Sequence, residues 1–220
     1  SILKKIADGE IHEINDFITY NLDIRAFAQD LLAQTNNHHF VRHFYHALQA
    51  ITILDPTCGS GAFLFAAMNI LEPLYEVCIS RMEEFNKQNQ GLFKDELGEI
   101  AQKYRSNIQY FIYKSIILRN LYGVDIMAEA VEIAKLRLFL KMVAVVDVDR
   151  RAKNLGLDPL PDIDFNIRCG NTLVGYATEK EIEESLYGSL ESNQNFSKYI
   201  QPEMEKVSMA EDACRTIQLS

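Results

Sequence analysis

Basic residues are in deficit in this chain of 220 residues, where 22 lysines and arginines stand against 31 aspartates and glutamates. The formal net charge is −9 at pH 7. Contacts to nucleic-acid phosphates require clustered lysine and arginine, so the composition argues against the chain gripping DNA by itself. An apolar content of 48% with 24% charged residues is ordinary for a globular protein and excludes a disordered chain. The length suits one domain with a substantial core, or two small ones.

Paired cysteines, a metal-ligand set and a long apolar run are also missing. The four cysteines are widely separated, with no CxxC pair, which indicates reduced thiols. His39, His43 and His46 recur at helical intervals, but no carboxylate or cysteine completes a zinc-type set at suitable spacing, so we expect no metal. No uninterrupted apolar run reaches the roughly 20 residues that span a bilayer, and the N-terminal residues lack the apolar core of a signal peptide. These absences predict a cytoplasmic protein without a membrane partner.

The most informative segment is the turn that follows the apolar, β-branched run of residues 51–54. Gly59 and Gly61 let the backbone turn tightly and approach a ligand closely, where side chains would block it. A pyrophosphate-binding turn normally carries a third glycine for helix packing, at the position that Leu64 occupies here. The carboxylate of Asp55, at the mouth of the turn, would repel phosphates but suits ammonium and sulfonium charges. The segment therefore predicts a pocket for a cationic nucleotide cofactor, S-adenosylmethionine.

Three segments carry a resemblance to a known family. Residues 54–64, which read Leu-Asp-Pro-Thr-Cys-Gly-Ser-Gly-Ala-Phe-Leu, resemble the cofactor motif of adenine-N6 DNA methyltransferases. They are most similar to the long single-chain enzymes of type IIG restriction-modification and of phage-exclusion systems of the BREX and phage-growth-limitation type. Residues 121–126 resemble the second motif of the family and residues 167–175 its third, in the same order. The similarity covers most of the chain up to about Ala177.

The catalytic signature of that family is absent. It consists of Asn or Asp followed by two prolines and an aromatic residue, whereas the five prolines of this chain never stand together. The resemblance therefore implies the cofactor-binding part of a larger adenine-N6 DNA methyltransferase, with no catalytic residue in this chain. Double-stranded DNA would be contacted through the missing parts of the parent protein. Two other interpretations stay open: a fragment of an RNA or protein-glutamine methyltransferase, and a non-catalytic module that binds an adenine nucleotide.

Strand and helix patterns alternate along the chain, which predicts an α/β fold with right-handed crossovers and a parallel sheet. We expect strands at residues 51–55, 121–125 and 165–169. The helix after the second strand should turn four side chains toward the sheet: Val131, Ala134, Leu138 and Met142.

The resemblance implies a Rossmann-like, S-adenosylmethionine-dependent methyltransferase sheet, of which these are the first three strands, with N-terminal and inserted helices. The first strand would then have an unpaired edge that invites association. The expected divisions are an N-terminal helical region (1–50), a cofactor-binding core (51–177) with a helical insertion at about 91–118, and a polar C-terminal segment (178–220).

Each candidate cofactor contact in the loop after the first expected strand also has a purely structural explanation. Asp55 would contact the amino group of the methionine moiety, directly or through water; otherwise it forms an Asx turn or caps the next helix. Thr57, Gly59 and Gly61 would line the same moiety, although glycine turns at strand ends are often turns alone. Cys58 lies in this loop with no adjoining histidine or lysine, so a neutral packing role is expected.

The acid that ends the second strand, Asp125, would accept hydrogen bonds from both ribose hydroxyls, with helix capping as the alternative. Ile126 would pack on the adenine ring. In the third motif the amide of Asn171 can donate to and accept from the adenine edge. The resemblance carries that assignment, since Asn after Gly is also an ordinary turn residue. Leu173 would close the apolar side of the pocket.

Overall fold

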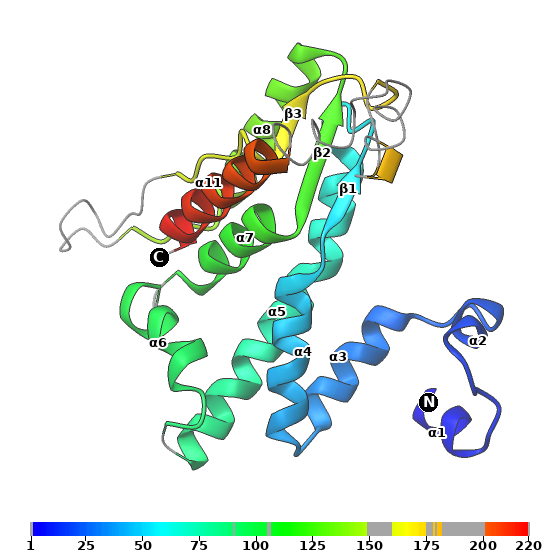
Figure 1. Ribbon diagram of the computed structural model, residues 1–220. Helices are drawn as coiled ribbons and strands as arrows, with labels where there is room; N and C mark the ends of the chain where they lie inside the picture. Colours follow the sequence, from blue (N-terminus) through cyan, green and yellow to red (C-terminus); the bar gives the residue numbers. More distant parts are fainter. Residues whose placement is uncertain are drawn as a thin grey trace. The chain divides into compact units, whose positions relative to one another are not determined.

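The computed structural model describes residues 2–89, 91–104, 107–148, 160–174, 178, 180–181 and 201–219. The chain divides into two compact units, each built from segments that are distant in sequence. Unit 1 comprises residues 1–51, 66–120 and 145–147, and unit 2 comprises residues 52–65, 121–144 and 148–220. Figure 1 labels the helices and strands and colours them along the sequence.

Unit 1 is helical in its described residues. Two of its helices begin at side-chain caps: Asp23 accepts the N–H of Ala26 at 2.9 Å, and Asn37 accepts the N–H groups of His39 and Phe40. The helices are α1 (Ile2–Ala7), α2 (Ile14–Thr19), α3 (Ile24–Gln34), α4 (His38–Ala50), α5 (Ala62–Gln88), α6 (Lys94–Lys103) and α7 (Ile108–Arg119), of which α5 begins in unit 2.

The core of unit 1 is built around α7. Residues 110–118 of this helix are all buried, so it is covered on every side and needs no polar face. Helices α4 and α5 meet through the rings of Tyr45 and Tyr75, whose centroids lie 5.9 Å apart in an edge-to-face arrangement. Residues 91–118, for which a helical insertion is expected, contain α6 and most of α7; that they form an insertion stays a prediction.

By length and hydropathy alone, the 27-residue helix α5 is apolar enough to cross a membrane. Glu72 and Glu76 interrupt its apolar run. Within unit 1, however, α5 is a core helix, since Met68, Tyr75 and Met82 are fully buried. A core helix meets the same test of composition.

A buried amide joins three helices of unit 1. Asn120, at the end of α7, has a fully buried side chain. Its Nδ2 donates to the backbone carbonyls of Leu48 and Ile51, both at 2.7 Å, and its Oδ1 accepts from the hydroxyl of Tyr75 at 3.1 Å. The amide therefore uses its donors and its acceptor on partners that would otherwise be unsatisfied in the core.

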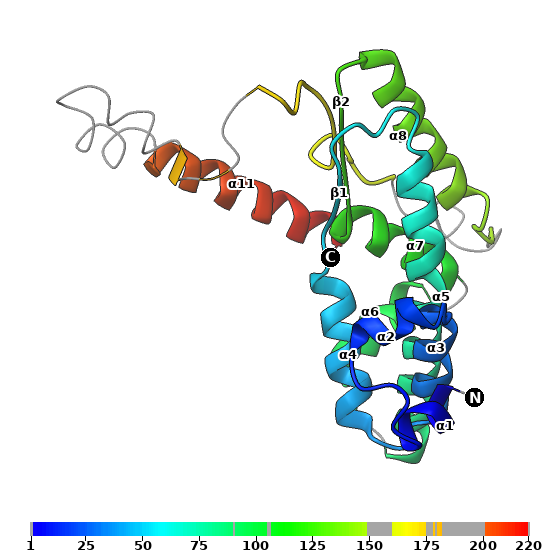
Figure 2. The same cartoon turned by 90° about the vertical axis from the view of Figure 1, so that its right-hand side faces the viewer.

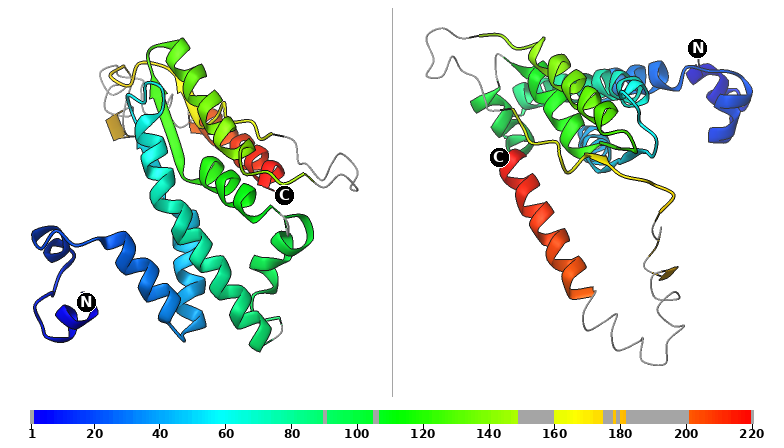
Figure 3. Two further views of the ribbon diagram at one scale, coloured as in Figure 1. Left: turned by 180° about the vertical axis from the view of Figure 1, so that it is seen from behind. Right: turned by 90° about the horizontal axis from the view of Figure 1, so that it is seen from above.

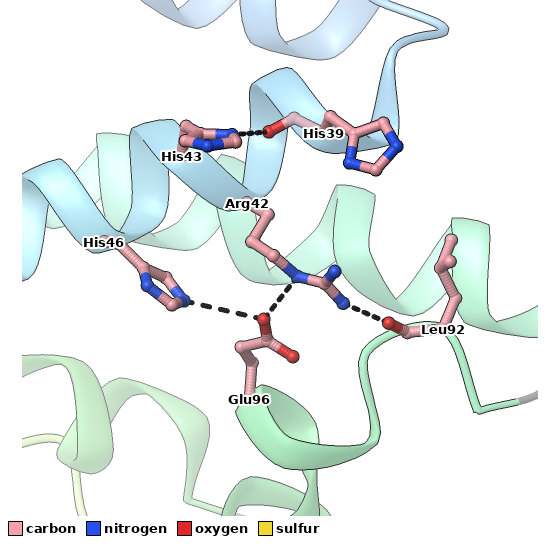
Figure 4. A network of polar contacts seen from close by, with 6 residues as sticks. All are labelled: His39, Arg42, His43, His46, Leu92 and Glu96. Atoms are coloured by element: carbon pink, nitrogen blue, oxygen red, sulfur yellow. Dashed lines mark hydrogen bonds and ion pairs between the residues drawn. The ribbon is translucent and has the colours of Figure 1, made fainter.

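A charged cluster fixes α6 to α4 (Figure 4). Arg42 donates through Nε to a carboxylate oxygen of Glu96 at 2.6 Å and through Nη2 to the carbonyl of Leu92. Its guanidinium also stacks on the ring of Phe93, with 4.8 Å between the guanidinium carbon and the ring centroid. The Nε2 atom of His46 lies 3.5 Å from the same oxygen of Glu96.

Unit 2 contains a three-stranded parallel sheet in the order β1-β2-β3, so the expected α/β fold is confirmed. The strands are β1 (Ile53–Asp55), β2 (Leu121–Asp125) and β3 (Ile167–Cys169). Ile53 pairs with Leu121, and Gly123 pairs with Ile167. Within the described residues β1 pairs with β2 alone.

Two strands begin two residues later than expected. Residue 51 still belongs to the preceding helix end, because its N–H donates to the carbonyl of Ala47. Before β3, the N–H groups of Asn166 and Ile167 both donate to the carbonyl of Ile163, which makes a turn where a strand was expected.

The helix α8 (Ala128–Val143) covers one face of the sheet through β2 and β3 (Figures 2 and 3). Its buried residues are the four that the periodicity predicts: Val131, Ala134, Leu138 and Met142. On the opposite face of the sheet, Leu54 is 59% exposed.

The helix α11 (Gln201–Leu219) lies in the polar C-terminal segment, for which the sequence patterns predict no helix at these residues. Its composition suits a helix, since Glu, Met, Ala and Lys are good helix formers and Pro202 stands in its first turn. The polar, acidic sequence also predicts a short helix around residues 181–186. Glu181 is helical, and the rest of that segment lies outside the described residues.

Candidate functional site

The carboxyl ends of the three strands lie at one edge of the sheet because the strands are parallel. The register places Asp55 beside Gly123 and Asp125 beside Cys169. The loops that follow β1, β2 and β3 therefore start next to one another, and the first two strands each end in an acid. In open α/β sheets, ligands bind in the crevice outside this edge.

The loop after β1 requires glycine at two positions. Gly59 has φ +49° and Gly61 has φ +81°, in the left-handed region that side chains disfavour. A Cβ atom on Gly61 would also lie 3.2 Å from the Cβ of Ala134 on α8. The Gly61 N–H donates to the carbonyl of Cys58 at 2.7 Å, which closes the turn. The two glycines expected from the sequence thus form a tight turn at the strand end.

Asp125 connects the second strand to this loop. Its Oδ2 accepts the N–H of Gly59 at 2.8 Å, and its Oδ1 accepts the N–H of Met127 at 2.9 Å. Hydrogen bonds from these two backbone N–H groups lower the pKa of the Asp125 carboxyl, and the bond from Met127 has the larger effect. The carboxyl is therefore ionised at neutral pH. The bond to Met127 is local and belongs to the start of α8, but local capping does not explain the bond to Gly59. Each carboxylate oxygen keeps a further lone pair for a ligand hydroxyl.

Asp55 makes a local turn, as its structural alternative predicted. Its Oδ1 accepts the N–H of Thr57 at 3.2 Å, an Asx-turn contact around Pro56. The carboxylate therefore stands at the mouth of the glycine loop with one oxygen used by the loop itself. Thr57 is exposed.

The loop after β3 is fastened to both neighbouring loops. The N–H of Gly170 donates to the carbonyl of Asp125 at 2.9 Å, and the Thr172 hydroxyl donates to the carbonyl of Pro56 at 2.7 Å. Asn171 is exposed and its Oδ1 accepts the N–H of Leu173 at 3.0 Å, which again is a turn contact.

Apolar side chains stand exposed beside these polar groups. Leu173 is 93% exposed and Ile126 is 69% exposed. Leucine and isoleucine at such exposure are suited to cover a flat apolar ring. The structure thus brings the chain segments of all eight predicted contact residues to the carboxyl edge of one sheet, while their ligand contacts remain predictions.

Two residues that shape the site were not singled out from the sequence. Gly123 lies under the first loop, where a Cβ atom would be 3.0 Å from both the Cys58 sulfur and a Leu64 methyl carbon. Thr172 supplies the bond to Pro56. Gly123 lies within the second motif, so its position in the motif could have identified it. Only the packing against Cys58 and Leu64 shows why a glycine is needed there.

Cys58 is a packing residue, as predicted. Its side chain is 5% exposed, and burial, together with the charges of Asp125 and Asp55, raises the pKa of its thiol. The thiol is therefore neutral and poorly nucleophilic at pH 7.

The histidines of α4 have other partners. The ring Nδ1 of His43 hydrogen-bonds the carbonyl of His39 at 2.7 Å, and His46 lies beside Glu96 (Figure 4). In the part of the chain that the structure describes, no three histidine, cysteine or acidic side chains are grouped to hold a metal ion.

A parallel sheet whose first two strands end in acids, with a glycine loop after the first, is typical of α/β domains that bind nucleotide cofactors. Residues 31–187 match the family model described as MmeI, DNA-methyltransferase domain. The chain therefore belongs to the MmeI DNA-methyltransferase domain family, which supports a Rossmann-like fold.

A curated relative agrees with this assignment. The chain is 38% identical over 167 residues to a protein of Methanocaldococcus jannaschii named as a type II restriction enzyme and methyltransferase. The match covers 76% of this chain and 12% of that relative, so the chain spans a small part of the relative's length. No solved structure matches the chain.

Proposed function

We propose that this chain is the S-adenosylmethionine-binding part of an adenine-N6 DNA methyltransferase of a restriction-modification or phage-defence system. The observation that carries the proposal is the ionised carboxylate of Asp125, which is bonded to the N–H of Gly59 at the edge where the strands end. Membership in a DNA-methyltransferase family supports the reaction class. The adenine-N6 assignment rests on the resemblance of the three motifs.

The residues at the strand ends fit this cofactor in charge and shape. Asp125 accepts the ribose hydroxyls with its remaining lone pairs. Asp55 supplies negative charge for the ammonium group of the methionine moiety, with Thr57, Gly59 and Gly61 along the same moiety. The cofactor, when bound, supplies the methyl group.

The adenine end of the cofactor lies between the second and third loops in this proposal. Ile126 and Leu173 cover its ring, and Asn171 pairs with its edge. A phosphorylated nucleotide fits this edge less well, because Asp55 and Asp125 would repel its phosphates.

The chain positions the methyl donor and leaves the target to other parts of a longer protein. Its net charge of −9 argues against the chain gripping DNA by itself, and its prolines cannot form the family's catalytic signature. Double-stranded DNA is therefore bound by the rest of the parent enzyme, in the cytoplasm. The role of this chain in catalysis is one of proximity and orientation.

Calorimetric titration with S-adenosylmethionine, NAD and ATP tests this proposal. We expect S-adenosylmethionine to bind at least about tenfold more tightly than either phosphorylated nucleotide, since phosphates meet two carboxylates. Tighter binding of NAD or ATP would contradict the proposal and favour a module for phosphorylated nucleotides. In a parallel assay with labelled cofactor and unmethylated plasmid, the chain alone should transfer no methyl group.

A further inference from the structure

Arg137 on α8 contacts the loop that carries the two glycines with positive φ, Gly59 and Gly61. Its Nη1 donates to the carbonyl of Ser60 at 2.8 Å and to the Ser60 hydroxyl at 3.2 Å. Its guanidinium also stacks on the ring of Phe65, with 4.7 Å between the guanidinium carbon and the ring centroid. Ser60 lies between Gly59 and Gly61, and Phe65 is one helical turn beyond them.

Strand β2 and the helix that follows it, α8, contact all three residues of the turn, which are Gly59, Ser60 and Gly61. Asp125, at the end of β2, accepts the N–H of Gly59. Arg137 holds Ser60, and the Cβ of Ala134, one turn earlier on α8, lies against Gly61. Successive residues of the loop are thus each fixed from β2 or α8.

Glycines with positive φ have many alternative conformations, so a loop containing two of them needs external contacts to stay in one geometry. A carbonyl held by a guanidinium cannot rotate without breaking a charge-assisted hydrogen bond. Stacking on Phe65 keeps the planar guanidinium from following the carbonyl if the loop moves.

We propose that Arg137 is a positioning residue for cofactor binding, which holds the Ser60 carbonyl and so keeps the backbone of Gly59 and Gly61 in the ligand-accepting conformation. The inference rests on the proposed binding of S-adenosylmethionine. Arg137 acts through the loop and does not contact the cofactor.

The test compares Arg137→Ala and Arg137→Lys with Arg81→Ala as the matched control. Arg81 also stacks on a phenylalanine ring, that of Phe85 at 4.8 Å, and donates to a backbone carbonyl, that of Thr35, but it belongs to unit 1. We expect Arg137→Ala to weaken S-adenosylmethionine binding about tenfold, the effect of one charge-assisted hydrogen bond. Arg137→Lys should restore part of the affinity, and Arg81→Ala should bind as the unmodified protein does.

Amide hydrogen exchange supplies a second readout that does not depend on the ligand. In Arg137→Ala, and to a smaller extent in Arg137→Lys, the amides of Gly59 and Gly61 should exchange faster while those of β2 keep their protection. Unchanged affinity in Arg137→Ala, or unchanged exchange at both glycines, would overturn the inference. If the unmodified protein binds no S-adenosylmethionine, the proposed function fails, and the exchange experiment still decides whether Arg137 orders the loop.

Discussion

Replacing Asp125 with alanine is expected to weaken S-adenosylmethionine binding by about 100-fold. The substitution removes the acceptors for two ribose hydroxyls, each a charge-assisted hydrogen bond. It also removes the acceptor of the Gly59 N–H, which lies 2.8 Å from Oδ2 and anchors the glycine loop. Calorimetric titration measures the change.

Comparison of two ligands separates the roles of the two acids. Adenosine shares the ribose of S-adenosylmethionine but lacks the ammonium and sulfonium charges. Asp125→Ala should therefore weaken both ligands, whereas Asp55→Ala should weaken S-adenosylmethionine and leave adenosine largely unaffected. Glu129→Ala is the control, because Glu129 is an exposed acid in the first turn of α8. An Asp125→Ala variant that is folded and binds both ligands normally would remove the ribose assignment.

The second large effect concerns stability. Asn120→Asp should lower the free energy of unfolding by about 3–5 kcal/mol, because an oxygen then replaces the Nδ2 donor opposite the carbonyls of Leu48 and Ile51. The side chain is 0% exposed, so water cannot compensate. For a chain of this size the loss corresponds to a fall in Tm of roughly 10 °C. Urea unfolding at pH 7 measures it.

The size of this effect should depend on pH. A protonated carboxyl can donate to one of the two carbonyls, so the deficit relative to the unmodified protein should shrink as the pH falls toward about 4. Asn89→Asp, an equivalent change at an exposed position, should alter stability by less than about 0.5 kcal/mol. Equal stabilities of the Asn120→Asp and Asn89→Asp variants would show that the buried amide network is unimportant.

Much of unit 2 could be predicted from local patterns. The acids at residues 55 and 125 end strands because apolar, β-branched runs precede them, and parallel strands bring such ends together. The periodicity of α8 identified the four residues that face the sheet. These features depend on sequence neighbours or on the repeat of one element, and both are visible in the sequence.

The contacts that shape the loops depend on distant partners. Arg137 and Ser60 are 77 residues apart, and Thr172 and Pro56 are 116 apart. No local rule indicates that an exposed arginine on α8 holds a loop carbonyl. Only the packed arrangement of the strand, the crossover helix and the turn brings these groups within hydrogen-bond distance.

The strand ends were also set by contacts that periodicity does not report. β1 starts late because the N–H of Ile51 is used by the preceding helix, and β3 starts late because Ile163 accepts two turn bonds. The resemblance assigns Leu173 and Ile126 to the cofactor pocket, but their exposure beside the strand ends could not be read from the sequence.

The central claim is that negatively charged strand ends in this chain receive a positively charged methyl donor. A crystal structure of the protein with S-adenosylmethionine tests it most directly. The account predicts the ribose hydroxyls on the carboxylate of Asp125, the methionine moiety along Gly59 and Gly61, and the adenine ring against Ile126 and Leu173. A cofactor bound elsewhere, or an empty carboxyl edge at saturating cofactor, would contradict it.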